Sequence, residues 1–226
     1  MAASTEAEAE RRKRGRPPAK EKAKRKDLDG GRSRDSEVVA AAVRLFYSKG
    51  YAATSIQDVA DELGLLKGSL YYYIDTKETL LRRIFETSHE QVQVIAEKYK
   101  ALDGPALERF QGFLNEYALW YLKNIPRASL FAREWRHAGD ELRAVMLEQR
   151  RYYDHTLRAL ILAVGDEHNL GPMVDASMIS NFIMSAVSSV PDWFHPEGSR
   201  SAEDVASLYV EYATRVLMGG KALAEK

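Results

Sequence analysis

Apolar residues recur every three or four positions along most of the chain from Asp35 onward, which is the period of an amphipathic helix. In the segment "SEVVAAAVRLFYSKG", Val39, Ala42, Val43 and Phe46 repeat with this period, and Gly50 closes the segment. We find no alternation of apolar and polar residues long enough to predict a β-strand, and no sequence repeat. The pattern therefore predicts an all-α protein.

Caps and helix-breaking residues divide this pattern into elements. Ser55 is the expected N-cap of a second helix that stops at Gly64, and a short segment from Lys67 to Ile74 follows. Asp75 or Thr76 caps a long helix that reaches about Leu102. Further helices are predicted at 105–123, 126–137, 139–165, 173–189 and 202–218, with a breaking segment from Pro191 to Gly198. A small N-terminal unit is thus followed by a larger helical bundle.

The second and third helices have the proportions of a helix-turn-helix, with the tight turn at Gly64. At about 100° per residue, Leu70 and Ile74 share one stripe of the third helix, with Tyr73 at its edge packing inward. The outer side would carry Gly68, Ser69, Tyr71 and Tyr72. Such a surface suits phosphates and base edges in a major groove, and Lys67 and Lys77 add positive charge beside it. The alternative is a tyrosine-rich turn in an ordinary bundle.

The formal net charge of zero hides a basic N-terminal arm on an acidic body. Residues 1–34 hold 12 Lys and Arg against 6 Asp and Glu, which leaves 21 basic and 27 acidic residues in 35–226. We expect the arm, 1–34, to be disordered and to meet a polyanion. Within it, Arg14-Gly15-Arg16-Pro17 resembles the core of a minor-groove hook, in which Arg14 and Arg16 enter the groove. The other interpretation is a solvated, non-specific basic arm.

One continuous stretch carries a family resemblance: "AAVRLFYSKGYAATSIQDVADELGLLKGSLYYYIDTKETLL". Residues 36–81 resemble the DNA-binding domain of the TetR family of bacterial transcriptional regulators. The resemblance implies DNA contacts by Thr54, Ser55, Gln57, Lys67, Gly68, Ser69, Tyr71, Tyr72 and Lys77. Where the family often opens the recognition helix with Ser or Thr, this chain has Leu66, which cannot bond a phosphate. The family further implies a C-terminal domain that dimerises through its last two long helices and binds a small effector.

The larger domain offers aromatic and arginine residues for an effector site. Most are expected in the core or on a solvated face, yet apolar walls with arginines at the mouth would suit an amphipathic anion. The candidates are Trp120, Phe131, Arg133, Trp135, Arg150 and Tyr153. The closing segment "VPDWFHPEGSRSAEDVASLYVEYATRVLMGG" resembles TetR-type regulators of fatty-acid and steroid catabolism, which respond to acyl-CoA esters. An acyl-CoA effector is therefore expected, with a free hydrophobic acid or a neutral drug-like molecule as alternatives.

The sequence lacks the motifs on which several classes of enzyme and metalloprotein depend. There is no cysteine, no nucleotide-binding glycine loop, no Gly-x-Ser-x-Gly motif and no clustering of the five histidines, so catalytic, metal and cofactor sites are not expected. No apolar run is long enough to span a membrane, and we expect a cytoplasmic protein.

We interpret the chain as a ligand-responsive repressor that binds a palindromic double-stranded operator as a homodimer. Its expected parts are the arm (1–34), a DNA-binding domain (35–80) and an effector-binding and dimerisation domain (81–226). The alternatives are a DNA-binding or architectural protein without an effector and, more remotely, a helical enzyme.

Overall fold

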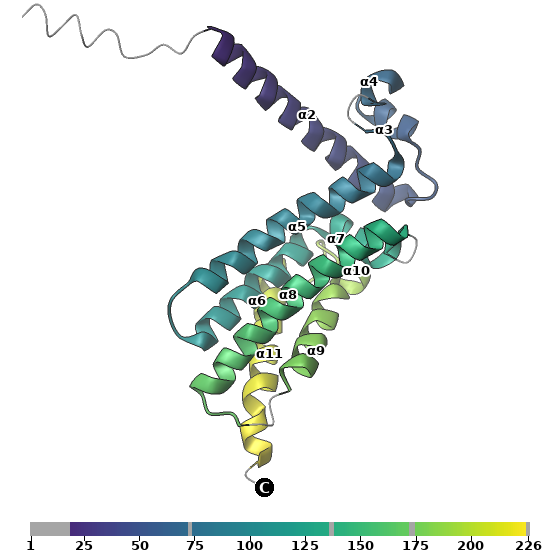
Figure 1. Ribbon diagram of the computed structural model, residues 1–226. Helices are drawn as coiled ribbons and strands as arrows, with labels where there is room; N and C mark the ends of the chain where they lie inside the picture. The colour runs from purple at the N-terminus through teal and green to yellow at the C-terminus, as the bar shows by residue number, and fades with distance from the viewer. Residues whose placement is uncertain (1–18, 72–73, 136–137, 172–174, 225–226) are drawn as a thin grey trace, which may run out of the picture.

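The computed structural model describes residues 19–71, 74–135, 138–171 and 175–224, and the secondary structure in these ranges is helical throughout (Figure 1). The all-α prediction is confirmed. The helices are α2 (Ala19–Lys49), α3 (Ile56–Glu62), α4 (Lys67–Tyr71), α5 (Lys77–Ala101), α6 (Ala106–Lys123), α7 (Ile125–Glu134), α8 (Asp140–Glu167), α9 (Ala176–Ser188), α10 (Val190–Trp193) and α11 (Ala202–Ala224).

The N-terminal helices share a core with the start of α5. Phe46 of α2, Val59 of α3 and Leu70 of α4 are buried together with Leu81 and Phe85 of α5. The same apolar cluster continues into the larger domain through Leu130, Leu142 and Met146. α7 therefore packs directly on α2, and α8 joins the same cluster beside α5, so the packing among the described residues continues across residue 80.

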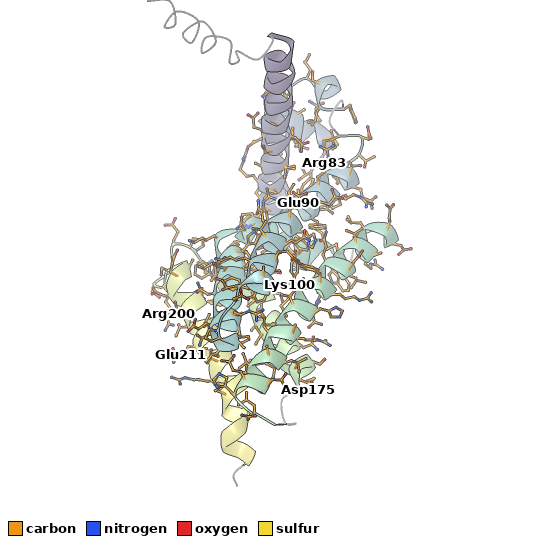
Figure 2. The ribbon with its side chains drawn as sticks, turned by 60° about the vertical axis from the view of Figure 1, so that its left-hand side comes forward. Arg83, Glu90, Lys100, Asp175, Arg200 and Glu211 are labelled. Carbon is orange, nitrogen blue, oxygen red and sulfur yellow. The ribbon has the colours of Figure 1, made fainter. Side chains whose placement is uncertain are left out.

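A second core holds the larger domain together. It lies among the C-terminal half of α5 and α6, α8, α9 and α11, which form a bundle below the N-terminal helices in Figure 1. Phe110, Phe113 and Leu114 of α6 are completely buried in it. Because α5 contributes to both cores, it is the continuous connection between them. An ion pair between Arg83 of α5 (labelled in Figure 2) and Asp35 joins α5 to α2 beside the N-terminal core.

Two segments differ from the expectation. Residues 19–34, expected to be disordered, continue α2 without a break. Repulsion within the basic block and its lack of apolar surface to bury predict disorder, whereas Ala, Lys, Glu and Arg are strong helix formers and backbone hydrogen bonds need no core. The remainder of the arm, including Arg14 and Arg16, lies outside the described residues. The short helix α10 lies where a breaker was expected, because Pro191 is compatible with the first turn of a helix.

Candidate DNA-binding surface and effector pocket

The helix-turn-helix begins with a capping box at the start of α3. The Asp58 amide donates to Ser55 Oγ over 3.1 Å, and the Ser55 amide donates to Asp58 Oδ2 over 2.8 Å. The Ser55 hydroxyl and the Ser55 amide both donate to the Asp58 carboxylate, and these two hydrogen bonds, with a contribution from Lys49, hold the pKa of that carboxyl well below its ordinary value. The predicted N-cap is confirmed, and the Ser55 side chain is exposed at the N-terminus of α3.

The turn between α3 and α4 is set by Gly64, whose φ of 63° lies in the left-handed region that favours glycine. The Leu65 amide then donates to the Ala60 carbonyl oxygen over 2.8 Å, which closes the end of α3. Ala60 itself is buried, so its small side chain lets α3 approach its neighbours. The sequence-based prediction of a tight turn at Gly64 is confirmed.

The short helix α4 presents one face to solvent. Leu70 and Ile74 are buried as the pattern predicted, while Gly68, Ser69 and Tyr71 are exposed. Leu66, just before the helix, is 81% exposed, so an apolar side chain opens this surface. Tyr72 and Tyr73 lie outside the described residues, as does the side chain of Lys67.

Two residues expected at the DNA have internal partners. Thr54 is buried, and its hydroxyl donates to the Gly50 carbonyl oxygen over 2.8 Å. The Lys77 ammonium donates to the carbonyl oxygens of Tyr51, Ala52 and Thr54 at 2.8, 3.2 and 3.0 Å. An ammonium has three donors, and all three are used by these carbonyls. In place of the expected phosphate contact, the Lys77 side chain holds the loop between α2 and α3.

Gln57 of α3 is half-buried, and its amide donates to Asp61 Oδ1 over 2.6 Å along the same helix. The structure thus brings Ser55, Gln57, Gly68, Ser69 and Tyr71 to the accessible sides of α3 and α4.

A cavity of about 330 Å³ lies in the larger domain, between the two cores. Its walls are dominated by six aromatic residues: Tyr117, Trp120, Tyr121, Phe131, Trp135 and Tyr153. Helices α5, α6, α7, α8 and α9 all contribute to the lining. A mainly apolar cavity of this size with a few polar groups is typical of a small-molecule site.

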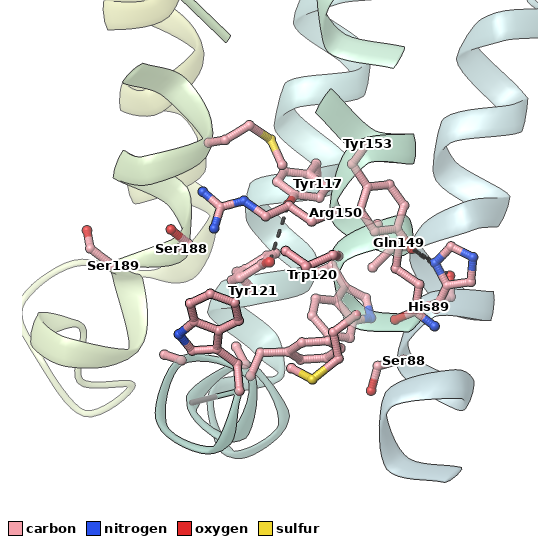
Figure 3. A pocket seen from close by; sticks show the side chains of 18 of the residues that line it. Ser88, His89, Tyr117, Trp120, Tyr121, Gln149, Arg150, Tyr153, Ser188 and Ser189 are labelled. Carbon is pink, nitrogen blue, oxygen red and sulfur yellow. Dashed lines mark hydrogen bonds between the residues drawn. The ribbon is translucent and has the colours of Figure 1, made fainter. Parts of the chain in front are cut away.

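Five of the six residues predicted for the effector line this cavity: Trp120, Phe131, Trp135, Arg150 and Tyr153. Arg150 is exposed, and Figure 3 shows its side chain directed toward Ser188 and Ser189 at one side of the pocket. Arg133 lies elsewhere, because its guanidinium is over the ring of Tyr47 on α2, 5.7 Å from the ring centroid. Burial raises the pKa of the Tyr117 and Tyr121 hydroxyls, while the nearby Arg150 charge acts in the opposite direction.

A polar pair at the opposite side was not predicted from the sequence. The Tyr153 hydroxyl donates to the backbone carbonyl oxygen of His89 over 3.0 Å and is also hydrogen-bonded to His89 Nδ1. Since a carbonyl can only accept, the tyrosine proton lies on that bond and His89 Nδ1 donates to the hydroxyl. Burial lowers the pKa of His89 against the opposing effects of Glu90 and Glu148, which favours the neutral imidazole. His89 could have been predicted as a pocket residue, because Ser88, His89 and Val92 share one face of α5.

Arg127 connects the pocket wall to α5. Its guanidinium donates to Thr87 Oγ1 over 3.1 Å and to Ser88 Oγ over 3.3 Å, and Ser88 lines the cavity. Burial lowers the pKa of this half-buried arginine. A ligand in the cavity would therefore contact Ser88 of α5, which is hydrogen-bonded to Arg127 of α7.

Neither a metal site nor a membrane-spanning helix is found in the ranges that the structure describes. Residues 19–71, 74–135, 138–171 and 175–224 hold no group of three or more His, Asp or Glu side chains placed to bind a metal ion. Among the same residues, the helices are too short or too polar to cross a bilayer.

Comparison with known proteins agrees with this arrangement. Residues 38–84 match the family model of bacterial regulatory proteins of the tetR family. Residues 103–217, about half of the chain, match the model of the tetracyclin repressor-like C-terminal domain. The chain belongs to the TetR family. It is therefore a DNA-binding transcriptional regulator, not an enzyme, and the predicted fold class and helix-turn-helix are confirmed.

Individual relatives resemble the chain over most of its length. The repressor KstR2 of Mycobacterium tuberculosis is 23% identical over 197 residues, which cover 83% of this chain and 92% of KstR2. The solved structure of that ketosteroid transcriptional regulator superimposes with a TM-score of 0.73 at 21% identity, covering 82% of this chain and 94% of KstR2. PfmR of Thermus thermophilus gives 0.72 at 29% identity, covering 79% and 97%. AibR, solved with isovaleryl coenzyme A and operator DNA, gives 0.70 at 22% identity, covering 79% and 97%.

Proposed function

We propose that this TetR-family chain is a homodimeric repressor that leaves its operator when a bulky acyl group, carried as a coenzyme A thioester, enters the pocket. The observation that carries the proposal is the aromatic cavity with the exposed Arg150 guanidinium at its side. The relatives support it, since KstR2 is a repressor and AibR was solved with an acyl-CoA and operator DNA.

The size of the cavity decides which part of such a ligand is enclosed. A volume of about 330 Å³ equals the space of roughly eleven water molecules at ~30 Å³ each. A ring or short chain fits, whereas the far larger coenzyme must lie outside. Its phosphates should not be buried unpaired, and a guanidinium binds phosphate oxygens in a bidentate manner. Arg150 is the pocket residue suited to this contact.

A dimer would cover an apolar surface on the last two long helices. Met178 and Phe182 of α9 are 64% and 58% exposed, and Tyr212 and Val216 of α11 are 55% and 43% exposed. Each pair is spaced four residues apart and so lies on one helical face. We name these four residues the α9/α11 face. Contiguous exposed apolar residues of this kind mark interaction sites, and a second copy with twofold symmetry would bury them.

Dimerisation also supplies the geometry for an operator. Two copies of α4 would enter successive major grooves, about 34 Å apart on a palindromic site. The basic arm would add phosphate contacts or, if Arg14 and Arg16 form a hook, minor-groove contacts. As a regulator bound to the bacterial chromosome, the protein would act in the cytoplasm.

Helix α5 would couple the pocket to release of the operator, because it contributes to both the pocket and the DNA-binding unit. α5 places Ser88, His89 and Val92 in the pocket and Leu81 and Phe85 in the core of the DNA-binding unit. A ligand that binds better to one position of α5 would shift the dimer toward that position. The spacing of the two α4 helices would then no longer match adjacent major grooves.

The test is to titrate a purified protein–operator complex with octanoyl-CoA, octanoic acid and free coenzyme A, and to measure the bound fraction by fluorescence anisotropy. Octanoyl-CoA should release the operator at the lowest concentration. Arg150→Ala should weaken this response by about 10-fold, as for a lost charge-assisted hydrogen bond. Arg133→Ala is the matched control, because Arg133 lies over Tyr47, and it should respond as the unaltered protein.

Release by octanoic acid as readily as by the thioester would remove the coenzyme from the proposal. Operator binding that ignores all three compounds would favour a DNA-binding protein with another effector or none.

A further inference from the structure

Gln149 of α8 is a polar residue in the wall of an aromatic pocket. Only 8% of it is exposed, and it lines the cavity beside His89 and Tyr153 (Figure 3). Its Oε1 is shielded from water, and the described residues supply this atom with no hydrogen-bond partner. Buried polar groups in proteins are nearly always paired, so an unpaired carboxamide in a ligand cavity calls for a partner from outside the chain.

Nearby polar groups of the pocket are engaged with one another. The Tyr153 hydroxyl bonds to His89, and the Tyr117 hydroxyl donates to Tyr121 over 3.3 Å. The Trp120 indole N–H donates to Gln91 Oε1 over 3.0 Å. These donors are therefore already committed in the ligand-free protein. No described residue bonds to Gln149 Oε1, so its partner in the cavity is water or a bound molecule that displaces the water.

We infer that Gln149 forms a subsite for a hydroxyl group on the body of the effector, on the side of the pocket away from Arg150. The inference rests on the proposed function only in that the cavity holds a ligand. A hydroxyl both donates and accepts, so it pairs with a carboxamide whichever way the amide group is turned. An effector without this group would leave the carboxamide unpaired, and sites built to bond a hydroxyl reject analogues that lack it.

This subsite narrows the class of ligand. Figure 3 shows Gln149, His89 and Tyr153 on one side of the pocket and Arg150 with the serines of α9 on the other. The effector would therefore carry an anionic group at one end and a hydroxyl at the other, with an apolar body between the aromatic walls. A hydroxylated ring or chain fits this pattern best, whereas a plain saturated acyl group, such as that of octanoyl-CoA, can enter the cavity but leaves Gln149 unpaired and should bind more weakly.

Phenol and toluene form a suitable pair of probes, because they differ in a hydroxyl against a methyl group and are small enough for the cavity. Their affinities for the full-length protein can be measured by ligand-observed NMR. We expect phenol to bind about 10-fold more tightly than toluene, the discrimination typical of a buried hydrogen bond. In Gln149→Met, which keeps a similar volume without polar atoms, the preference should be lost and toluene should bind at least as tightly as phenol, because the phenol hydroxyl would then be buried unpaired. Gln111→Met is the matched control, since Gln111 bonds to Thr214 on α11, and it should keep the preference.

The melting temperature of ligand-free Gln149→Met provides a readout that needs no probe. It should not fall, because no hydrogen bond of Gln149 is lost. A clear fall would show that the carboxamide is already paired and would overturn the inference. Equal affinity of the unaltered protein for phenol and toluene, binding of neither, or a preference that survives in Gln149→Met would also overturn it.

The fragment measurements are independent of the proposed effector. Phenol and toluene carry neither a thioester nor an acid. If acyl-CoA fails to release the operator while phenol is preferred through Gln149, the coenzyme is wrong and the subsite stands. The converse result removes the subsite and leaves the acyl-CoA proposal in place.

Discussion

The Lys77 ammonium donates a 2.8 Å hydrogen bond to the Tyr51 carbonyl oxygen and lies 4.5 Å from the centroid of the Tyr51 ring. It thereby joins the first turn of α5 to the loop that leads into α3. Replacing Lys77 by Met removes these contacts and leaves three carbonyl oxygens without this donor. We expect the free energy of unfolding to fall by about 2 kcal/mol, as for hydrogen bonds to a charged group. Urea denaturation measures this loss.

Lys123→Met is the control for that substitution, because Lys123 forms an exposed ion pair with Glu203 over 2.7 Å. Exposed pairs contribute at most ~1 kcal/mol. If Lys77→Met instead keeps its stability while the salt dependence of operator binding flattens by about 0.9 per copy, the ammonium contacts a phosphate.

Gly112 of α6 lies against the ring of Tyr99 on α5. A Cβ atom added at Gly112 would be 2.4 Å from Tyr99 Cε1, and Tyr99 is buried with its hydroxyl donating to Glu116 over 2.8 Å. Gly112→Ala should therefore destabilise the protein by about 1–3 kcal/mol through overpacking, although alanine is the better helix former. Gly165→Ala on α8 is the control, because its added Cβ meets no described atom within 4 Å. That variant should gain stability, and equal effects at both sites would contradict the packing argument.

Local features of the sequence were sufficient to predict much of the fold. Ser55 caps α3 as predicted, and of the two candidates Asp75 and Thr76 it is Thr76 that caps α5; such predictions succeed because capping depends on residues within one turn. The buried stripe of Leu70 and Ile74 followed from the helical period. The extent of α2 was not predicted, since helix formation over residues 19–34 depends on helix propensity and the sequence there shows no apolar stripe of helical period.

The pocket depends on contacts between distant segments, which the pattern does not contain. His89 and Tyr153 are 64 residues apart and meet only when α5 packs against α8. Arg133 and Arg150 were equivalent candidates in the sequence. The rotation of α7 directs Arg133 to Tyr47, whereas the rotation of α8 places Arg150 at the cavity.

His89 predicts a pH dependence of stability. Its pKa in the folded protein is lowered by burial from the ordinary value of 6.5, so the unfolded chain binds more protons near and below that pH. Stability should therefore be retained above pH 6.5 and fall as the pH decreases below it. His89→Gln should lose part of this slope when urea denaturation at pH 7.5 and 5.5 is compared. His195→Gln, which removes an exposed imidazole, is the control, and an unchanged slope in His89→Gln would contradict the assignment.

The α9/α11 face predicts the oligomeric state. Phe182→Glu would place two like charges close to the twofold axis of a dimer, which is strongly unfavourable when they are desolvated. We expect a folded monomer in analytical ultracentrifugation and weak operator binding. Val94→Glu on α5 is the matched control, because Val94 is also an exposed apolar residue, at 70% exposure, and this variant should remain dimeric. A dimer that persists in Phe182→Glu would place the interface elsewhere.

Gly68 of α4 predicts a separation of DNA binding from stability. An added Cβ there would meet no described atom within 4 Å, and Gly68 has none of the positive φ angles found at Gly50 and Gly64. The fold therefore gives no reason for glycine at this exposed helical position, whereas a backbone that approaches DNA closely does. Gly68→Ala should keep or raise the free energy of unfolding, by up to ~1 kcal/mol from helix propensity. Its affinity for the operator should fall, as measured by fluorescence anisotropy. Gly165→Ala serves again as the control and should bind the operator normally, so that normal binding by Gly68→Ala would exclude α4 from a close approach to the DNA.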